Sequence, residues 1–256
     1  MHSKLPSVVE DARTPANTES VDDTLLYIAD SLEKFHIFQG HRLRVLNQST
    51  YFSYLENLMA ETCLELMSNC PWCLWVIDWK MKFEAQRFRE ASTHHYGKRG
   101  IGWHGIIVVY YTYEARCEKN KFKGRAVRHQ VALDQILGNG NKQDGFAVLS
   151  KIEAAMAQIS REIPHLKHAR VWSDNAGCYH KKELLFGIPL LNVMSSGIKI
   201  LSLVHTETQD GKGLADGHFS VAFKHVVEYL VTRLMNEFRK VCPPLHLQML
   251  LPAKMA

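Results

Sequence analysis

After Pro71 the chain alternates short apolar runs with longer amphipathic stretches, and this order constrains the fold more than any other feature of the sequence. The first run, Trp72–Trp79, lies between a proline and charged residues and suits a buried strand better than a helix. Trp103–Tyr113 and Val127–Ile136 are rich in β-branched and aromatic residues and predict two more strands. Three strands in succession indicate an antiparallel meander.

Helices and strands alternate in the second half of the chain. The clearest helix is Phe146–Ile163, whose apolar residues recur at helical spacing before Pro164 ends it. The later elements are predicted at His168–Trp172 (strand), Lys181–Phe186 (short helix), Ile198–Val204 (strand) and residues 214–240 (long helix, with Phe219, Phe223, Val226, Leu230, Leu234 and Phe238 on one face). Strand–helix–strand units imply parallel pairing with right-handed crossovers. The expected fold is α/β, a mixed five-stranded sheet flanked by helices.

The segment before Pro71 has a different character. Residues 1–20 are polar and predict a flexible arm, while Val21–Phe35 and Tyr51–Met67 predict two helices that pack on the sheet domain. The expected organisation is an arm at 1–20, a helical region at 21–69, the sheet domain at 70–240 and a tail at 241–256.

Composition excludes several classes of protein. The chain is 46% hydrophobic, enough for a substantial core, but no apolar run is long enough to span a membrane and the N-terminus lacks the apolar region of a secretory signal. Six scattered cysteines do not make a disulfide scaffold, so we expect a reducing compartment, nuclear or cytoplasmic, and no secretion. Cys70 and Cys73 are interpreted as buried thiols, with half of a zinc site as the alternative.

Three aspartates occupy chemically suggestive places. Asp78 lies in the first strand, Asp174 directly follows the fourth strand, and Asp216 opens the last helix. If the first and fourth strands pair in parallel, all three converge at one edge of the sheet, where open α/β folds bind ligands. Converging carboxylates repel one another without a cation, and hard oxygen ligands suit Mg²⁺ or Mn²⁺. Each aspartate taken alone can also be interpreted as purely structural: Asp78 as a polar residue that interrupts an apolar strand, Asp174 as a turn residue and Asp216 as a helix cap.

Four segments resemble the DDE/DDD transposase and retroviral-type integrase core of the ribonuclease H-like superfamily, in the form found in eukaryotic transposon-derived proteins. They are VIDWKMKFE, YGKRGIGWHG, VWSDNAGCYHKKELL and HTETQDGKGLADGHFSVAFKHVVEYL. The resemblance covers roughly residues 70–235 and implies a ribonuclease H-like sheet. It also implies that Asp78, Asp174 and Asp216 are catalytic residues holding two Mg²⁺ or Mn²⁺ ions.

Two other residues are candidates for the third metal ligand, because Glu207 and Asp210 also lie between the fifth strand and the last helix. Asp216 is preferred because a helix holds a ligand more rigidly than a glycine loop does. His205 and His218 flank this region and are interpreted as structural.

Basic residues define an expected nucleic-acid contact. They alternate near the predicted hairpin tip and recur in the glycine loop: Lys119, Lys121, Lys123, Arg125, Arg128 and Lys212. A net charge of +5 agrees with a polyanionic partner. A solvated charged loop is the competing interpretation.

The resulting functional hypothesis is metal-dependent DNA strand cleavage and transfer by a two-metal nuclease core. Residues 1–70 show no separate DNA-binding domain, so a fragment, a decayed copy or a captured core stays open. The alternatives are a non-catalytic DNA- or protein-binding module of the same fold and an RNA-cleaving enzyme. DNA is the expected partner, and a homo-oligomer is also considered.

Overall fold

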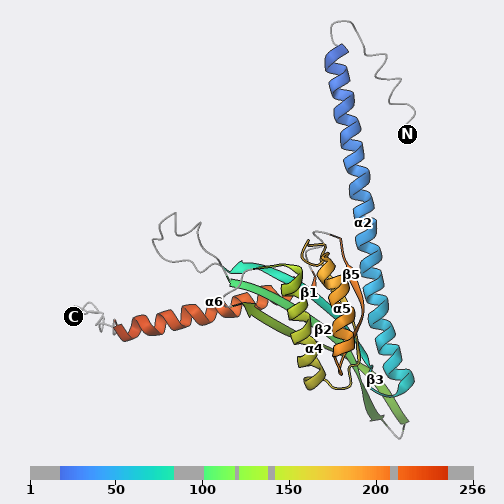
Figure 1. Cartoon of the computed structure of the whole chain (residues 1–256), viewed down its shortest axis with the longest axis vertical. Helices are drawn as coiled ribbons and strands as arrows, with labels where there is room; N and C mark the ends of the chain where they lie inside the picture. The colour runs from blue at the N-terminus through green and yellow to red at the C-terminus, as the bar shows by residue number, and fades with distance from the viewer. Residues whose placement is uncertain (1–17, 84–100, 119–120, 138–141, 208–212, 242–256) are drawn as a thin grey trace, which may run out of the picture.

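The structure, a computed structural model, describes residues 18–83, 101–118, 121–137, 142–207 and 213–241. Its elements follow one another along the chain as shown in Figure 1. They are α2 (Thr18–Leu66), β1 (Trp72–Phe83), β2 (Ile101–Glu118), β3 (Lys121–Leu137), α4 (Gly145–Glu162), β4 (His168–Ser173), α5 (Lys182–Met194), β5 (Lys199–His205) and α6 (Leu214–Val241).

The five strands form one mixed sheet in the order β3-β2-β1-β4-β5. β1 pairs with β2 and β2 with β3 in antiparallel fashion, whereas β1–β4 and β4–β5 are parallel. The α/β class and the mixed five-stranded sheet are therefore confirmed, as is the parallel pairing of the first and fourth strands on which the convergence of Asp78 and Asp174 depends.

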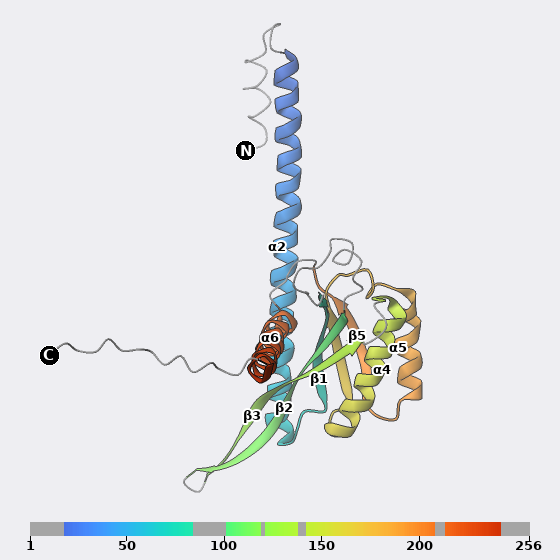
Figure 2. The same ribbon diagram turned by 90° about the vertical axis from the view of Figure 1, so that its left-hand side faces the viewer.

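The sheet carries a hydrophobic core on each face, because alternate residues of its strands point to opposite sides. Trp75, Ile77 and Ile106 join the core that contains the apolar side of α4 and α5. Leu74 and Ile107 point the other way, into a core completed by α2 and α6. Figure 2 shows the resulting three layers, with α4 and α5 on one side of the sheet and α2 and α6 on the other.

The N-terminal region differs from its prediction. Instead of two helices after an arm ending at residue 20, a single 49-residue helix runs from Thr18 to Leu66. The polar residues between the two predicted helices contain no proline, and Gln48 binds the end of β5, so nothing interrupts the backbone there. Only the C-terminal part of α2 packs on the sheet, through Leu55, Met59 and Cys63.

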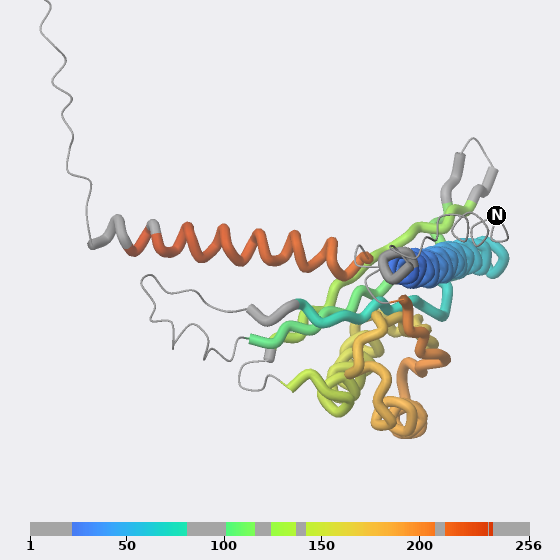
Figure 3. Tube along the Cα trace, turned by 90° about the horizontal axis from the view of Figure 1, so that it is seen from above, coloured from blue at the N-terminus to red at the C-terminus, as the bar shows by residue number. Residues whose placement is uncertain are grey.

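The last helix also differs from expectation. Its first turns are anchored by Ala215 and Phe219, which are buried. Further along the predicted apolar face, Val226, Leu230 and Leu234 are 37%, 41% and 68% exposed, because α6 runs beyond the edge of the sheet. Figure 3 shows α6 leaving the body of the molecule in a different direction from α2.

Several predicted elements prove longer in the structure. β3 begins at Lys121 and includes most of the basic segment, and β2 extends to Glu118 to pair with it. α5 continues past Pro189 to Met194, and its buried residues include Gly187, which packs against Leu149 of α4, and Ile188. No helix among the described residues has the length and apolar character that crossing a membrane requires.

The thiols of Cys70 and Cys73 are fully buried, as predicted. Burial raises the pKa of Cys70 to about 11 and that of Cys73 to about 12, so both stay protonated at neutral pH. Neither is therefore an activated nucleophile.

Candidate metal centre

Asp78 and Asp174 lie side by side because β1 and β4 are parallel and in register. The last paired residues are Val76 with Trp172 and Ile77 with Ser173. Asp78 and Asp174 come one step further along, Asp174 just past the end of β4 and Asp78 in the middle of the longer strand β1. Within β1, Asp78 continues the alternation of Leu74 and Val76, so it points to the face covered by α2 and α6. Local periodicity and strand pairing together thus position two of the three predicted acids.

Asp216 reaches the same place from the first turn of α6. The start of α6 is seated on β2 by Phe219, whose ring lies where a side chain at Gly105 would be: a Cβ there would come within 2.7 Å of the ring. Gly105 is the β2 residue opposite Asp78 in the antiparallel register. Trp103 packs edge-on against the Phe219 ring, with centroids 5.6 Å apart. A residue without a side chain at 105 therefore lets α6 approach β1 closely enough to bring Asp216 to Asp78.

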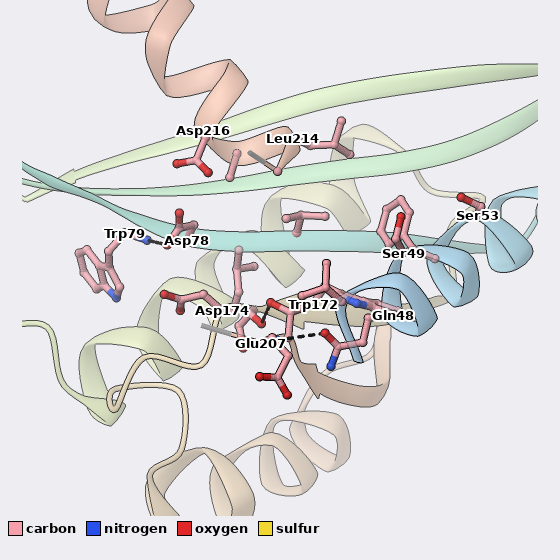
Figure 4. Close-up of a pocket in the computed structure, with 18 of the residues that line it drawn as sticks. Gln48, Ser49, Ser53, Asp78, Trp79, Trp172, Asp174, Glu207, Leu214 and Asp216 are labelled. Carbon is pink, nitrogen blue, oxygen red and sulfur yellow. Dashed lines mark hydrogen bonds between the residues drawn. The ribbon is translucent and has the colours of Figure 1, made fainter. Parts of the chain in front are cut away.

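The three aspartates line one open pocket of about 670 Å³, shown in Figure 4. Asp216 comes from α6 on one side, Asp78 from β1 in the middle and Asp174 from the end of β4 on the other side. α2 supplies the remaining wall, including Gln48, Ser49 and Phe52.

Two of these carboxylates, Asp78 and Asp174, have raised pKa values. Burial, followed by the charge of Asp174, raises the pKa of Asp78 to about 7, and Asp216 adds to the effect. The pKa of Asp174 is also raised, mainly by burial, although a hydrogen bond from the Ala176 N–H and the neighbouring His180 oppose the shift. The backbone N–H of Trp79 donates to Asp78 Oδ1 at 2.7 Å, too little to offset burial. A divalent cation would relieve the same repulsion.

The donor chemistry of the pocket fits Mg²⁺ or Mn²⁺, which prefer carboxylate oxygens. The side chains are not, however, gathered around a single point: among the described residues no three His, Cys, Asp or Glu form a ready-made ligand set for one ion. Asp78 lies between the other two in Figure 4 and is the residue that could share two ions.

Glu207, one of the rival third acids, lines the same pocket but is already neutralised. It forms an ion pair with Arg44, and His41 Nδ1 lies 3.0 Å from its Oε2. These hydrogen bonds lower the pKa of Glu207. Its backbone N–H also donates to Gln48 at 3.0 Å, so Glu207 ties α2 to the end of β5. The other rival, Asp210, lies outside the described residues.

The histidines flanking Asp216 have structural partners. His205 Nδ1 lies 2.8 Å from the hydroxyl oxygen of Ser173, and the ring of His180 stacks on it at 3.9 Å. His218 Nε2 lies 2.8 Å from Asp134, which also accepts a hydrogen bond from Trp103. These contacts agree with the structural interpretation.

Those of the predicted basic contact residues that the structure describes do not line the aspartate pocket. Lys119 and Lys212 lie outside the described residues, whereas Lys121 and Lys123 lie in β3 near the hairpin tip. Arg125 is paired with Glu114, and Arg128 with Glu56 of α2. Lys121 pairs with Glu118, which is roughly 40 Å along β2 from Gly105 at the usual rise per strand residue. The hairpin tip is therefore too far from the aspartates to belong to the same contact site.

Sequence reasoning missed two features of this site. One is the wall formed by α2, because nothing in its sequence distinguishes Gln48 or Arg44 from other polar helix residues. The other is a buried polar pair beneath the pocket, His104 and Tyr179, whose ring centroids are 6.3 Å apart. His104 Nε2 and the Tyr179 hydroxyl lack a hydrogen-bond partner among the described residues, and burial lowers the pKa of His104 to about 4.

Comparison with known proteins adds no relative: no family model, curated protein or solved structure matches the chain. The resemblance to transposase and integrase cores therefore remains a prediction from the sequence motifs.

Proposed function

We propose that the chain is a ribonuclease H-like, transposon-derived core that cleaves and joins DNA strands with two Mg²⁺ or Mn²⁺ ions held by Asp78, Asp174 and Asp216. The observation that carries the proposal is the meeting of three carboxylates from β1, β4 and α6 in one open pocket with raised pKa values at Asp78 and Asp174. Such an arrangement is unfavourable for a purely structural role, because nothing cationic in the described pocket wall faces these three acids as Arg44 faces Glu207.

The roles of the chain's own residues follow from their positions. Two ions held by these residues would supply activation of a water or 3′-hydroxyl nucleophile and stabilisation of the leaving oxygen. Asp78, Asp174 and Asp216 would hold these ions, with Asp78 lying between the other two acids (Figure 4). The pocket is open, so a nucleic-acid backbone can approach the carboxylates without a rearrangement of the sheet.

The deciding experiment is a strand-cleavage assay on a panel of DNA, RNA and DNA–RNA hybrid with Mg²⁺, Mn²⁺ or EDTA. We expect metal-dependent cleavage of DNA that Asp78→Asn abolishes. Asp144→Asn is the matched control, because Asp144 caps α4 through its side chain and asparagine caps equally well. Preferential cleavage of RNA would point instead to a ribonuclease.

The alternative is a captured, non-catalytic binding module of the same fold. One observation favours it: the three aspartates do not form a ready-made ligand set for a single ion. In that case the chain binds DNA or protein equally well with EDTA, shows no cleavage of any substrate, and Asp78→Asn changes neither result.

A further inference from the structure

Lys80 lies on β1 two residues beyond Asp78, and its ammonium group is held against α6. The nitrogen lies 5.6 Å from the ring centroid of Trp103, 5.7 Å from that of Phe219 and 4.6 Å from that of Phe223. It also donates a hydrogen bond to the carbonyl oxygen of Phe219 at 3.4 Å. Asp78 points to the same face of the sheet, because alternate residues of a strand share a side. A positive charge thus lies beside the aspartate pocket, among aromatic rings that attract it.

No ion pair joins Lys80 to a carboxylate among the residues that the structure describes. Two other cations on the α2 side of the sheet are neutralised, Arg44 by Glu207 and Arg128 by Glu56. The contacts of Lys80 within the described part of the chain, three rings and one carbonyl, use one of its three N–H donors. The residue is only partly buried, so a ligand can reach it. Lys80 is therefore a cation suited to an anionic ligand.

Lys80 lies on the side of Asp78 away from α2. Figure 4 shows α2 on one side of Asp78 and Trp79 on the other, and Lys80 is the next residue of β1. Asp78 and Lys80 are about 6.6 Å apart along the strand at the usual rise per residue. Phosphates of one nucleic-acid strand follow one another about every 3.4 Å along the helix axis. A phosphate one or two nucleotides from a phosphate at the aspartates therefore comes within reach of the lysine.

A nucleic-acid strand at this pocket needs a cation close by. Three carboxylates repel the phosphates that flank the reacting one, and metal ions held by the carboxylates would act mainly on the reacting phosphate. The basic hairpin tip is roughly 40 Å from Gly105 along β2, whereas charges in solution are screened over about 8 Å at physiological salt. Lys80 is close enough to offset the repulsion, and the hairpin tip is not.

We propose that Lys80 binds a backbone phosphate of the nucleic-acid substrate close to the phosphate at the aspartates. The rings of Trp103, Phe219 and Phe223 already hold the side chain in one place, so less of its conformational entropy is lost on binding. Lys80 has this role only if a nucleic-acid strand enters the pocket, so the proposal rests on the proposed function. It adds a contact that binds the strand, whereas the aspartates would hold the metal ions.

DNA binding over a salt series, measured by fluorescence anisotropy with Ca²⁺ in place of Mg²⁺, tests this role. Lys80→Met keeps an unbranched stem against the rings and removes the charge. It should weaken binding about tenfold at low salt and lower the salt dependence by about one counterion. Lys80→Arg keeps the charge and should bind within about threefold of the wild type.

Lys167→Met is the matched control. Lys167 is exposed and directly precedes β4, at the end opposite to the one that Asp174 follows, so this variant should bind DNA as the wild type does. Lys80→Gln removes the charge with a different stem and should repeat the effect of Lys80→Met. Far-UV circular dichroism checks that every variant is folded. The cleavage rate at saturating DNA should stay within about threefold in all of them, because Lys80 does not touch the reacting phosphate.

Four outcomes separate Lys80 from the proposed function. Unchanged affinity and salt slope in Lys80→Met overturn the role of Lys80 alone when the wild type cleaves DNA. An equal loss in Lys80→Arg and Lys80→Met also overturns it, since Lys80 would then only pack against the rings. If the wild type binds no nucleic acid, this role and the proposed function fail together. If Lys80→Met weakens DNA binding in a chain that cleaves no substrate, Lys80 keeps its role and only the proposed function fails.

Discussion

The aspartate pocket contains two kinds of carboxylate, and their environments are opposite. Asp78 and Asp174 are partly buried, repel one another and have raised pKa values. Glu207, on the same pocket, is held by Arg44 and His41 and has a lowered pKa. Both kinds line one wall or another of a single space, so the difference does not come from location alone. Burial is the main cause of the raised pKa values of the two aspartates, whereas Arg44 and His41 of α2 lower the pKa of Glu207.

This contrast separates a structural acid from a candidate ligand. A carboxylate that already has a protein cation gains little from a metal ion, whereas carboxylates that repel one another gain the full relief of that repulsion. Glu207 thus holds α2 to the end of β5 through its ion pair with Arg44. The three aspartates form the part of the pocket that is suited to an external cation.

The largest expected effect is on cleavage. On the proposed function, Asp216→Asn should lower metal-dependent cleavage by at least about a hundredfold, since it would remove a proposed ligand of the ions that stabilise the transition state. Glu207→Gln should keep activity within about threefold, because Glu207 acts on the fold rather than on the metal. Initial rates in a nicking assay measure both. If Glu207→Gln or Asp210→Asn proves the more damaging change, the third ligand has been misassigned.

The second effect concerns stability without metal. In the folded state the pKa of Asp78 is about 7, whereas in the unfolded chain it is near 4. The folded protein therefore retains a proton on Asp78 at pH values where the unfolded chain has released it. Stability from this group is therefore lost as pH rises across that interval. Asp78→Asn cannot ionise, so its free energy of unfolding should exceed the wild type's by about 1–2 kcal/mol at about pH 8, after allowance for solvent screening, and by little near pH 4.

Urea denaturation in EDTA at both pH values measures this difference. Glu207→Gln should behave in the opposite way, losing stability above the unfolded pKa of a glutamate, because the folded pKa of Glu207 is lowered. If both substitutions changed the free energy of unfolding in the same direction as pH rises, the division into two kinds of carboxylate would be wrong.

A smaller effect is expected on melting temperature. Millimolar Mn²⁺ should raise the melting temperature by about 2–5 °C through preferential binding to the folded state. The shift should persist in Glu207→Gln and in the cap control Asp144→Asn, and it should vanish in Asp174→Asn. A wild-type melting curve that Mn²⁺ leaves unchanged would count against the site. Differential scanning fluorimetry with EDTA as the reference supplies the measurement.

The smallest effect concerns the hairpin tip. Replacing Lys119, Lys121 and Lys123 with alanine should weaken DNA binding severalfold and flatten its salt dependence by up to three counterions. Because the tip lies roughly 40 Å from Gly105 along β2, the cleavage rate at saturating DNA should not change. Fluorescence anisotropy over a salt series gives the slope. An unaltered slope would leave the segment as a solvated loop.

Local patterns in the sequence determined a large part of this protein. The apolar runs around β1, β4 and β5 and the helical spacing of α4 are short-range features, as are the positions of Asp78 within a strand, Asp174 after a strand and Asp216 at the start of a helix. They are sufficient to predict the class of fold and the parallel pairing that brings Asp78 and Asp174 together. These features can be recognised in the sequence because burial makes apolar residues recur every second residue in strands and every 3.6 residues in helices. Neighbouring residues are enough to show that spacing.

Only the tertiary structure decided the rest. Arg44 and Glu207 are 163 positions apart, and no local period signals that they form an ion pair. The continuity of α2, its place as a wall of the pocket and the exposure of most of α6 depend on which surfaces the sheet leaves free. Asp216 likewise reaches Asp78 because Gly105 leaves space for the Phe219 ring. Such contacts arise from packing between segments that are distant in the sequence. The free energy of that packing is spread over many residues, and no local pattern in the sequence marks any one of them.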